Sequence, residues 1–162
     1  MVEAALVTGI AVLGTLLGAT LTYFFQKRQA VYIHAMTARE RLRTERIAAY
    51  GALVEGVADL RGGQLIRWTT RRESPADSDE YAQARSDSWR LRAVARSAMY
   101  RVQLVTDDED FARRARELVE LTIQILDAVD TDDLAARAQR SADETDAFIV
   151  EARLRLGSGG TG

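Results

Sequence analysis

The residues from Ala4 to Phe25 form one uncharged run of 22, and this run restricts the possible folds of the chain more than any other feature. Fifteen of the 22 are hydrophobic and the other seven are glycine or threonine. As a helix with about 1.5 Å rise per residue, the run spans roughly 33 Å, slightly more than a bilayer core of about 30 Å. A signal peptide has a shorter apolar region and positive charge ahead of it. We therefore expect residues 1–25 to be a retained transmembrane helix with a short external N-terminus, rather than a signal peptide or a buried soluble helix.

Charges beside the run predict its orientation. Glu3 precedes it, whereas Lys27 and Arg28 follow it directly, within reach of anionic lipid headgroups. Further arginines follow at Arg39, Arg41, Arg43 and Arg46. The positive-inside rule then places the N-terminus outside the cell membrane and the rest of a single-pass protein in the cytoplasm.

One face of the predicted span carries small residues at helical spacing. Gly14, Gly18 and Thr22 are four residues apart, and Ala11 lies three residues before Gly14. Small residues at this spacing let two helices approach closely in lipid, as in GxxxG dimers. We expect helix–helix association through this face, and hence a homo-oligomer.

The remaining chain has a helical pattern with a single proline and abundant alanine and arginine. The expected helical segments are Gln26 to about Leu60 with a continuation from Gln64 to Arg72, Asp79 to Leu104, Glu109 to about Val129, and Asp132 to about Leu156. Gly62–Gly63 is expected to kink or interrupt the first segment, and the polar stretch Gln139–Asp146 to fray. Residues 157–162 (GSGGTG) read as a flexible tail.

These segments predict an all-α fold in which the transmembrane helix continues into a cytoplasmic antiparallel bundle of three to four helices, residues 26–156. Trp68 and Trp89 are expected to anchor the bundle, and contact with a partner is the less favoured alternative. Alanine fills many of the expected core positions, so the core buries little area per residue. Oligomerisation, including coiled-coil-like pairing, is expected to add stability.

Charge is distributed in blocks along the chain. The net charge is +6 over 26–72, −4 over 73–110 and −3 over 111–162. We favour intramolecular packing of the basic block beside the acidic ones. Contact of the basic block with membrane lipid is a second interpretation. Nucleic acid is a less favoured partner for Arg39, Arg41, Arg43 and Arg46, because glutamates are interleaved and no recognition motif frames them.

Catalytic signatures are absent from the sequence. There is no cysteine and only one histidine, His34, and no glycine-rich phosphate loop follows a strand. The acidic clusters Asp107–Asp110 and Asp130–Asp133 precede predicted helices, where capping explains them. We expect no catalytic residue, no metal site, no cofactor and no enzymatic activity.

The order of segments resembles a known family. An uncharged span, VLGTLLGATLTYFFQKR, is followed by the charged helix RERLRTERIAAYGALVEGVADLR and later by RVQLVTDDEDFARRAR. This layout resembles small actinobacterial membrane proteins described as KilB-like, after a protein of plasmid transfer and spread. The resemblance implies a membrane-associated role in plasmid spread or an envelope process, with no catalytic residues.

The sequence thus predicts a membrane-anchored interaction or oligomerisation module that binds an unidentified cytoplasmic protein. Two alternatives remain open at this point. One is a membrane-tethered nucleic-acid or plasmid-transfer accessory that uses the four arginines, and the other is an oligomer that perforates the membrane.

Overall fold

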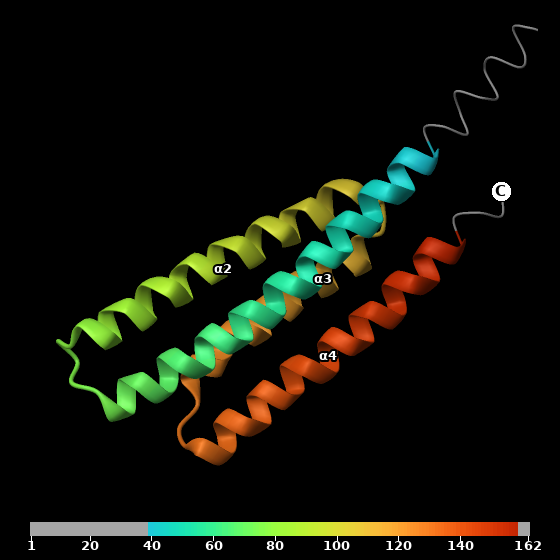
Figure 1. Cartoon of the computed structure of the whole chain (residues 1–162). Coiled ribbons are helices and arrows are strands. Elements are labelled where there is room, and N and C mark those ends of the chain that lie inside the picture. The colour runs from blue at the N-terminus through green and yellow to red at the C-terminus, as the bar shows by residue number, and fades with distance from the viewer. Residues whose placement is uncertain (1–38, 159–162) are drawn as a thin grey trace, which may run out of the picture. The chain divides into compact units, whose positions relative to one another are not determined.

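The computed structural model describes residues 39–158, and every regular element in this range is helical, without a β-strand. The elements are a helix over 39–73, α2 (Asp79–Val105), α3 (Glu109–Ile123), the short 3-10 helix η1 (Gln124–Asp127) and α4 (Thr131–Ser158) (Figure 1). The predicted all-α bundle is therefore confirmed in the described range, with four helices. The final helix includes Gly157 and Ser158, which the sequence had assigned to the tail.

Several predicted features lie outside the described residues. These are the span Ala4–Phe25, its association face (Ala11, Gly14, Gly18 and Thr22), the headgroup contacts Lys27 and Arg28, and His34. Within residues 39–158, no helix has the length and apolar character needed to cross a membrane.

The chain divides into a unit of residues 1–42 and a unit of residues 43–162. In the first unit, residues 39–42 are helical and exposed. The second unit contains the bundle, in which α3 packs against both α2 and α4 (Figure 1). Loops of only a few residues join successive helices, so neighbours in sequence run antiparallel.

Side chains at the loops cap the helices, and two of the caps lie in the acidic clusters for which the sequence predicts this role. The Ser78 hydroxyl accepts a hydrogen bond from the Tyr81 N–H at the start of α2. Asp108 accepts one from the Phe111 N–H at 2.9 Å at the start of α3. Asp130 does the same for α4, accepting from the Asp133 N–H at 2.8 Å. These caps satisfy N–H groups that have no partner within the first turn of a helix.

The interruption expected at Gly62–Gly63 is wrong, because the helix runs unbroken over 39–73. A Cβ on Gly63 would lie 2.5 Å from Leu91 Cδ1, and one on Gly56 would lie 3.2 Å from Ala95 Cα. Two glycines therefore mark the close approach of α2 to this helix. The packing gained there outweighs the helix-propensity cost of about 1 kcal/mol per glycine.

The fraying expected over Gln139–Asp146 is also wrong, because this stretch is an unbroken part of α4. Ser141 and Thr145 are buried, and the Ser141 hydroxyl lies 2.8 Å from Thr122 Oγ1 on α3. Arg61 Nη1 donates to both Ser141 and Thr145, at 3.4 and 3.5 Å. Tertiary hydrogen bonds thus hold a turn of helix that its local polarity alone would not favour.

The third predicted helix ends earlier than expected. The α-helix stops at Ile123 and continues as η1 to Asp127, rather than reaching Val129. Here Trp68 Nε1 donates to the Ala128 carbonyl at 2.8 Å, and Trp68 is only 2% exposed. A side chain from the 39–73 helix therefore anchors the turn, as predicted for Trp68. The same prediction for Trp89 is wrong, since its side chain is 60% exposed.

Three aromatic rings form the centre of the core at one end of the bundle. Phe111 and Phe148 stack with ring centroids 4.7 Å apart, and Tyr50 packs edge-on against Phe111 at 5.1 Å. Alanine fills many of the other buried positions, as expected: Ala49, Ala84, Ala95, Ala98, Ala115, Ala128 and Ala152. The core is thus made of close helix contacts around a small aromatic cluster.

Candidate functional site: an apolar groove beside the C-terminal helix

A groove of about 390 Å³ runs between the 39–73 helix and α4. Its lining is almost entirely apolar. The lining residues are Ile47, Tyr50, Gly51, Val54, Glu55 and Ala58 from the first helix, and Phe148, Ile149, Ala152, Arg153 and Leu156 from α4. Exposed apolar hollows of this kind are typical of binding surfaces.

The sequence explains why the two helices leave a groove instead of closing. Tyr50 and Phe148 belong to the aromatic cluster and form the floor. Small residues stand where larger side chains would fill the gap, namely Gly51, Ala58 and Ala152. A Cβ at Gly51 would meet nothing within 4 Å. The apolar walls therefore face open space, and Ile47 remains 51% exposed.

Two charged side chains line the groove, one on each wall. Glu55 lies on the 39–73 helix and Arg153 on α4. Neither has a hydrogen-bond or ion-pair partner among the described residues. The groove is thus an apolar surface with one free anion and one free cation.

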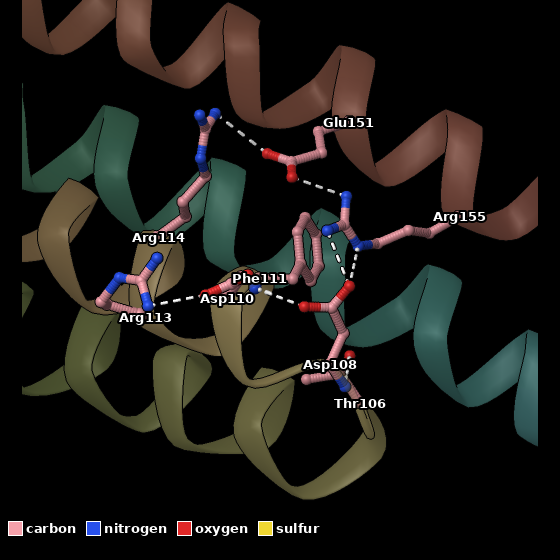
Figure 2. Close-up of polar contacts among 8 residues, drawn as sticks. All are labelled: Thr106, Asp108, Asp110, Phe111, Arg113, Arg114, Glu151 and Arg155. Carbon is pink, nitrogen blue, oxygen red and sulfur yellow. Dashed lines mark hydrogen bonds and ion pairs between the residues drawn. The ribbon is translucent and has the colours of Figure 1, made fainter.

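An ion-pair cluster fixes the α4 wall to the start of α3 (Figure 2). Arg155 donates to Asp108 from Nε at 3.0 Å and from Nη2 at 2.7 Å, and to Glu151 from Nη1 at 2.6 Å. The second Glu151 oxygen lies 3.0 Å from Arg114 Nη1 on α3. The Arg155 guanidinium also lies 4.5 Å from the centroid of the Phe111 ring. The position of the groove wall is therefore set by contacts behind it.

The ion-pair cluster contributes to a lowered pKa of the Asp108 carboxyl. The hydrogen bond from the Phe111 N–H, followed by that from Arg155, holds the pKa of Asp108 below its ordinary value. At the next loop, the Val129 N–H and then Arg137 lower the pKa of Asp133 in the same way. Both carboxylates cap or brace helix ends, which agrees with the structural role predicted for the acidic clusters.

The four arginines predicted to contact nucleic acid or an acidic partner differ in their exposure. Arg39, Arg41 and Arg43 are exposed. Arg46 is partly buried, and it donates from Nε to the Val105 carbonyl at 2.7 Å and pairs with Asp107 at 3.1 Å. Arg46 therefore braces the end of α2 and does not belong to a free cationic patch.

The basic block was predicted to pack beside the acidic ones, but its arginines Arg61, Arg71 and Arg72 contact groups other than carboxylates. Arg71 and Arg72 donate to the carbonyl oxygens of Leu126 and Val129. Carbonyl oxygens at helix ends carry partial negative charge and attract cations. In the described range, Arg71 and Arg72 thus contact carbonyl oxygens, Arg61 contacts the hydroxyls of Ser141 and Thr145, and Arg46 forms an ion pair with Asp107 of the acidic block.

A second hollow, of about 540 Å³, surrounds the exposed Trp89. Its lining residues are Arg67, Ala82, Arg85, Ser86 and Trp89. The Arg92 guanidinium lies 5.9 Å from the Trp89 ring centroid. This places cations around an exposed indole, an arrangement that the sequence analysis missed.

The sequence carries a signal for the groove in the spacing of apolar residues on the first helix, although no groove was predicted from it. Ile47, Gly51, Val54 and Ala58 recur at spacings of four, three and four residues, beside the core stripe that contains Leu53 and Val57. Two adjacent apolar stripes on one helix indicate a second packing surface. Among the described residues, no group of three or more His, Cys, Asp or Glu side chains is placed to hold a metal ion.

Comparison with known proteins identifies the family. A family model described as KilB plasmid transfer protein matches residues 47–156, which is more than half of the chain. A search of curated proteins and a search of solved structures found no significant match. The matched range begins at Ile47 and ends at Leu156, so it contains every residue that lines the groove. The resemblance predicted from the segment order is confirmed, and the chain belongs to the KilB plasmid transfer protein family.

Proposed function

We propose that this protein is a membrane-anchored, non-catalytic helical module that acts in plasmid transfer by binding a protein through the apolar groove. The observation that carries the proposal is the groove itself, apolar on both walls and contained in the family-matched range. Burial of such a surface against a partner is the main source of affinity in protein association.

The uncharged run over Ala4–Phe25 supports the membrane anchor, and Lys27 and Arg28 support its cytoplasmic orientation. An anchored bundle meets its partner in a thin layer beside the membrane. Confinement of this kind raises the effective concentration of both surfaces, so a modest groove affinity is sufficient.

The test measures plasmid transfer from donor cells that carry the full chain with Ile47→Asp. This change places a charge in the apolar groove at a side chain that is already 51% exposed. We expect transfer to fall by about tenfold or more, because binding would desolvate the carboxylate. Leu104→Asp is the matched control, since Leu104 is 84% exposed on α2 and does not line the groove. Equal transfer by both variants, at equal protein level, would contradict the proposal.

Binding of nucleic acid is a second candidate function, and the hollow around Trp89 favours it. An exposed indole flanked by Arg67 and Arg85 offers a stacking surface and cations for phosphates. The test titrates the full chain in detergent with a single-stranded oligonucleotide at low and high salt. Salt-sensitive binding that Trp89→Ala weakens would support this function, and no binding at low salt would exclude it.

A further inference from the structure

We infer that the groove receives one amphipathic α-helix of a different protein. About three turns of this helix lie in the groove, with a basic residue on one flank of its apolar face and an acidic residue ten positions away on the other flank. This inference rests on the proposed function, because it names the chemistry of the partner that the same groove binds. It is carried by the backbone, the side-chain sizes and the charges of the two walls.

Both walls of the groove are helices, and this excludes a partner that binds as an added β-strand. The lining residues extend from Ile47 to Ala58 on the first helix and from Phe148 to Leu156 on α4. Both ranges lie inside unbroken helices, whose backbone N–H and C=O groups bond within the helix. A strand needs a sheet edge with free backbone groups, whereas an apolar groove between helices takes the apolar face of another helix.

Small and large side chains alternate along the first wall at the spacing of helix turns. Gly51 and Ala58 are seven residues apart with Val54 between them, and the half-exposed Ile47 lies one turn before Gly51. A Cβ on Gly51 would meet nothing within 4 Å, so the surface is low there. Seven residues of helix rise about 10.5 Å, which is also the distance between positions i and i+7 of a partner helix. Two bulky apolar side chains two turns apart on that helix would therefore enter the spaces over Gly51 and Ala58.

The two charged groups of the groove lie on opposite walls and toward opposite ends. Tyr50 and Phe148 pack edge-on across the floor, with ring centroids 6.3 Å apart. Glu55 is five residues beyond Tyr50, and Arg153 is five residues beyond Phe148. Because the first helix and α4 run antiparallel, these steps lead in opposite directions, so the two charges are about 15 Å apart along the bundle. They are too far apart to pair with each other, and neither has a partner among residues 39–158.

One straight helix matches this separation. A rise of about 15 Å corresponds to ten residues, and positions i and i+10 differ by about 80° around a helix axis. An apolar stripe of this width lies between them, so one charged side chain is placed over each wall. A basic residue beside Glu55 and an acidic residue beside Arg153 would then pair with two groups that are exposed on the described surface.

The test measures binding of synthetic peptides to the full chain in phosphatidylcholine nanodiscs by fluorescence anisotropy. Each peptide has about 18 residues, enough to form a helix, with leucines at helical spacing and two charged positions ten residues apart. The charged pair is Lys and Glu in the first peptide, two Lys in the second and two Glu in the third. A fourth peptide has the composition of the first but its leucines in strict alternation. The Gly51→Glu chain gives the background, including contact of each peptide with lipid.

We expect the first peptide to bind the natural chain at least about tenfold more tightly than the Gly51→Glu chain, whose added carboxylate occupies the groove. Gly62→Glu is the matched control and should bind like the natural chain, because Gly62 lies on the same helix outside the groove. Equal binding to the natural and Gly51→Glu chains would overturn the inference, as would equal binding of the first and the alternating peptides.

Charge reversal tests the two predicted ion pairs. The natural chain should prefer the Lys–Glu peptide by about threefold, the Glu55→Arg chain the Glu–Glu peptide, and the Arg153→Glu chain the Lys–Lys peptide. The same order of affinities in all three chains would overturn the charge pattern assigned to the partner. Co-purification of two differently tagged copies that Gly51→Glu abolishes would assign the groove to a second copy and would also overturn the inference.

The two proposals fail in distinguishable ways. If Ile47→Asp lowers plasmid transfer but no peptide distinguishes the natural chain from Gly51→Glu, the groove binds a protein by another kind of surface and only the present inference is wrong. If the peptides bind as expected but Ile47→Asp leaves transfer intact, the groove binds a helix and the proposed function is wrong.

Discussion

Arg155 and Asp108 are joined by two hydrogen bonds to one carboxylate oxygen, from Nε at 3.0 Å and from Nη2 at 2.7 Å. This pair connects the last turns of α4 to the residue that caps α3. Because Arg153 and Leu156 of the groove flank Arg155 in sequence, the same pair positions one wall of the groove.

This relationship predicts a dependence of stability on pH. The pKa of Asp108 is lowered in the folded state, so its contribution is complete above the unfolded pKa and is lost as the pH falls through the folded pKa. Asp108→Asn should therefore lower the melting temperature at pH 7, and the difference from the natural chain should shrink below about pH 4. Thermal melts followed by circular dichroism measure this. A difference that stays constant down to pH 2 would contradict the assigned role.

The buried pair Gln64–Ser88 gives a second prediction. The Ser88 hydroxyl donates to Gln64 Oε1 at 2.7 Å, and Gln64 Nε2 donates to the Ile123 carbonyl. Ser88→Ala leaves a buried acceptor without a partner and should cost about 1–3 kcal/mol in the free energy of unfolding. Ser86→Ala, at an exposed position two residues away, should change it by less than about 0.5 kcal/mol. Denaturant unfolding of both variants provides the comparison.

The two tryptophans give a third prediction. Trp68→Phe removes the hydrogen bond to the Ala128 carbonyl and leaves space in the core, so it should destabilise the chain by about 1–3 kcal/mol. Trp89→Phe removes no buried contact and should be nearly neutral. Equal melting temperatures for the two variants would show that Trp68 does not anchor the turn after η1.

The glycines of the first helix give a fourth prediction. Gly62→Ala adds a Cβ in open space and should stabilise the chain by about 0.5–1 kcal/mol. Gly56→Ala adds a Cβ 3.2 Å from the Ala95 backbone, so repulsion should remove this gain and lower stability below that of the natural chain. A stabilising effect of Gly56→Ala would show that α2 moves aside easily.

Helix starts were predictable from this sequence because their determinants are local. Ser78, Asp108 and Asp130 act within three residues of themselves, so short-range patterns identify them. The helix through Gly62–Gly63 packs closely against Leu91, which is distant in sequence. The stretch around Ser141 is likewise held by Thr122 and Arg61 from other helices. Local polarity and propensity cannot report such contacts.

The candidate site was less accessible to sequence reasoning than the fold. The groove forms because two helices that are far apart in sequence leave apolar residues exposed on the same side of the bundle. Periodicity shows that a helix has an apolar stripe, but it does not show which residues of the stripe another helix buries. Ile47 lies one turn from the buried Tyr50 and is nevertheless half exposed, and Trp89, which is expected to anchor the bundle, lies on the surface. The sequence pattern also does not show that Arg46, unlike Arg41 and Arg43, contacts the Val105 carbonyl and Asp107 at the end of α2.

The most direct test of the groove as the functional surface compares Gly51→Glu with Gly62→Glu in the plasmid-transfer assay. Both glycines lie on the same helix with nothing within 4 Å of an added Cβ, but only Gly51 lines the groove. Both variants should fold, and Gly51→Glu alone should reduce transfer, by about tenfold or more, because its carboxylate fills an apolar groove. Transfer by Gly51→Glu equal to that of Gly62→Glu, at equal protein levels, would contradict the account.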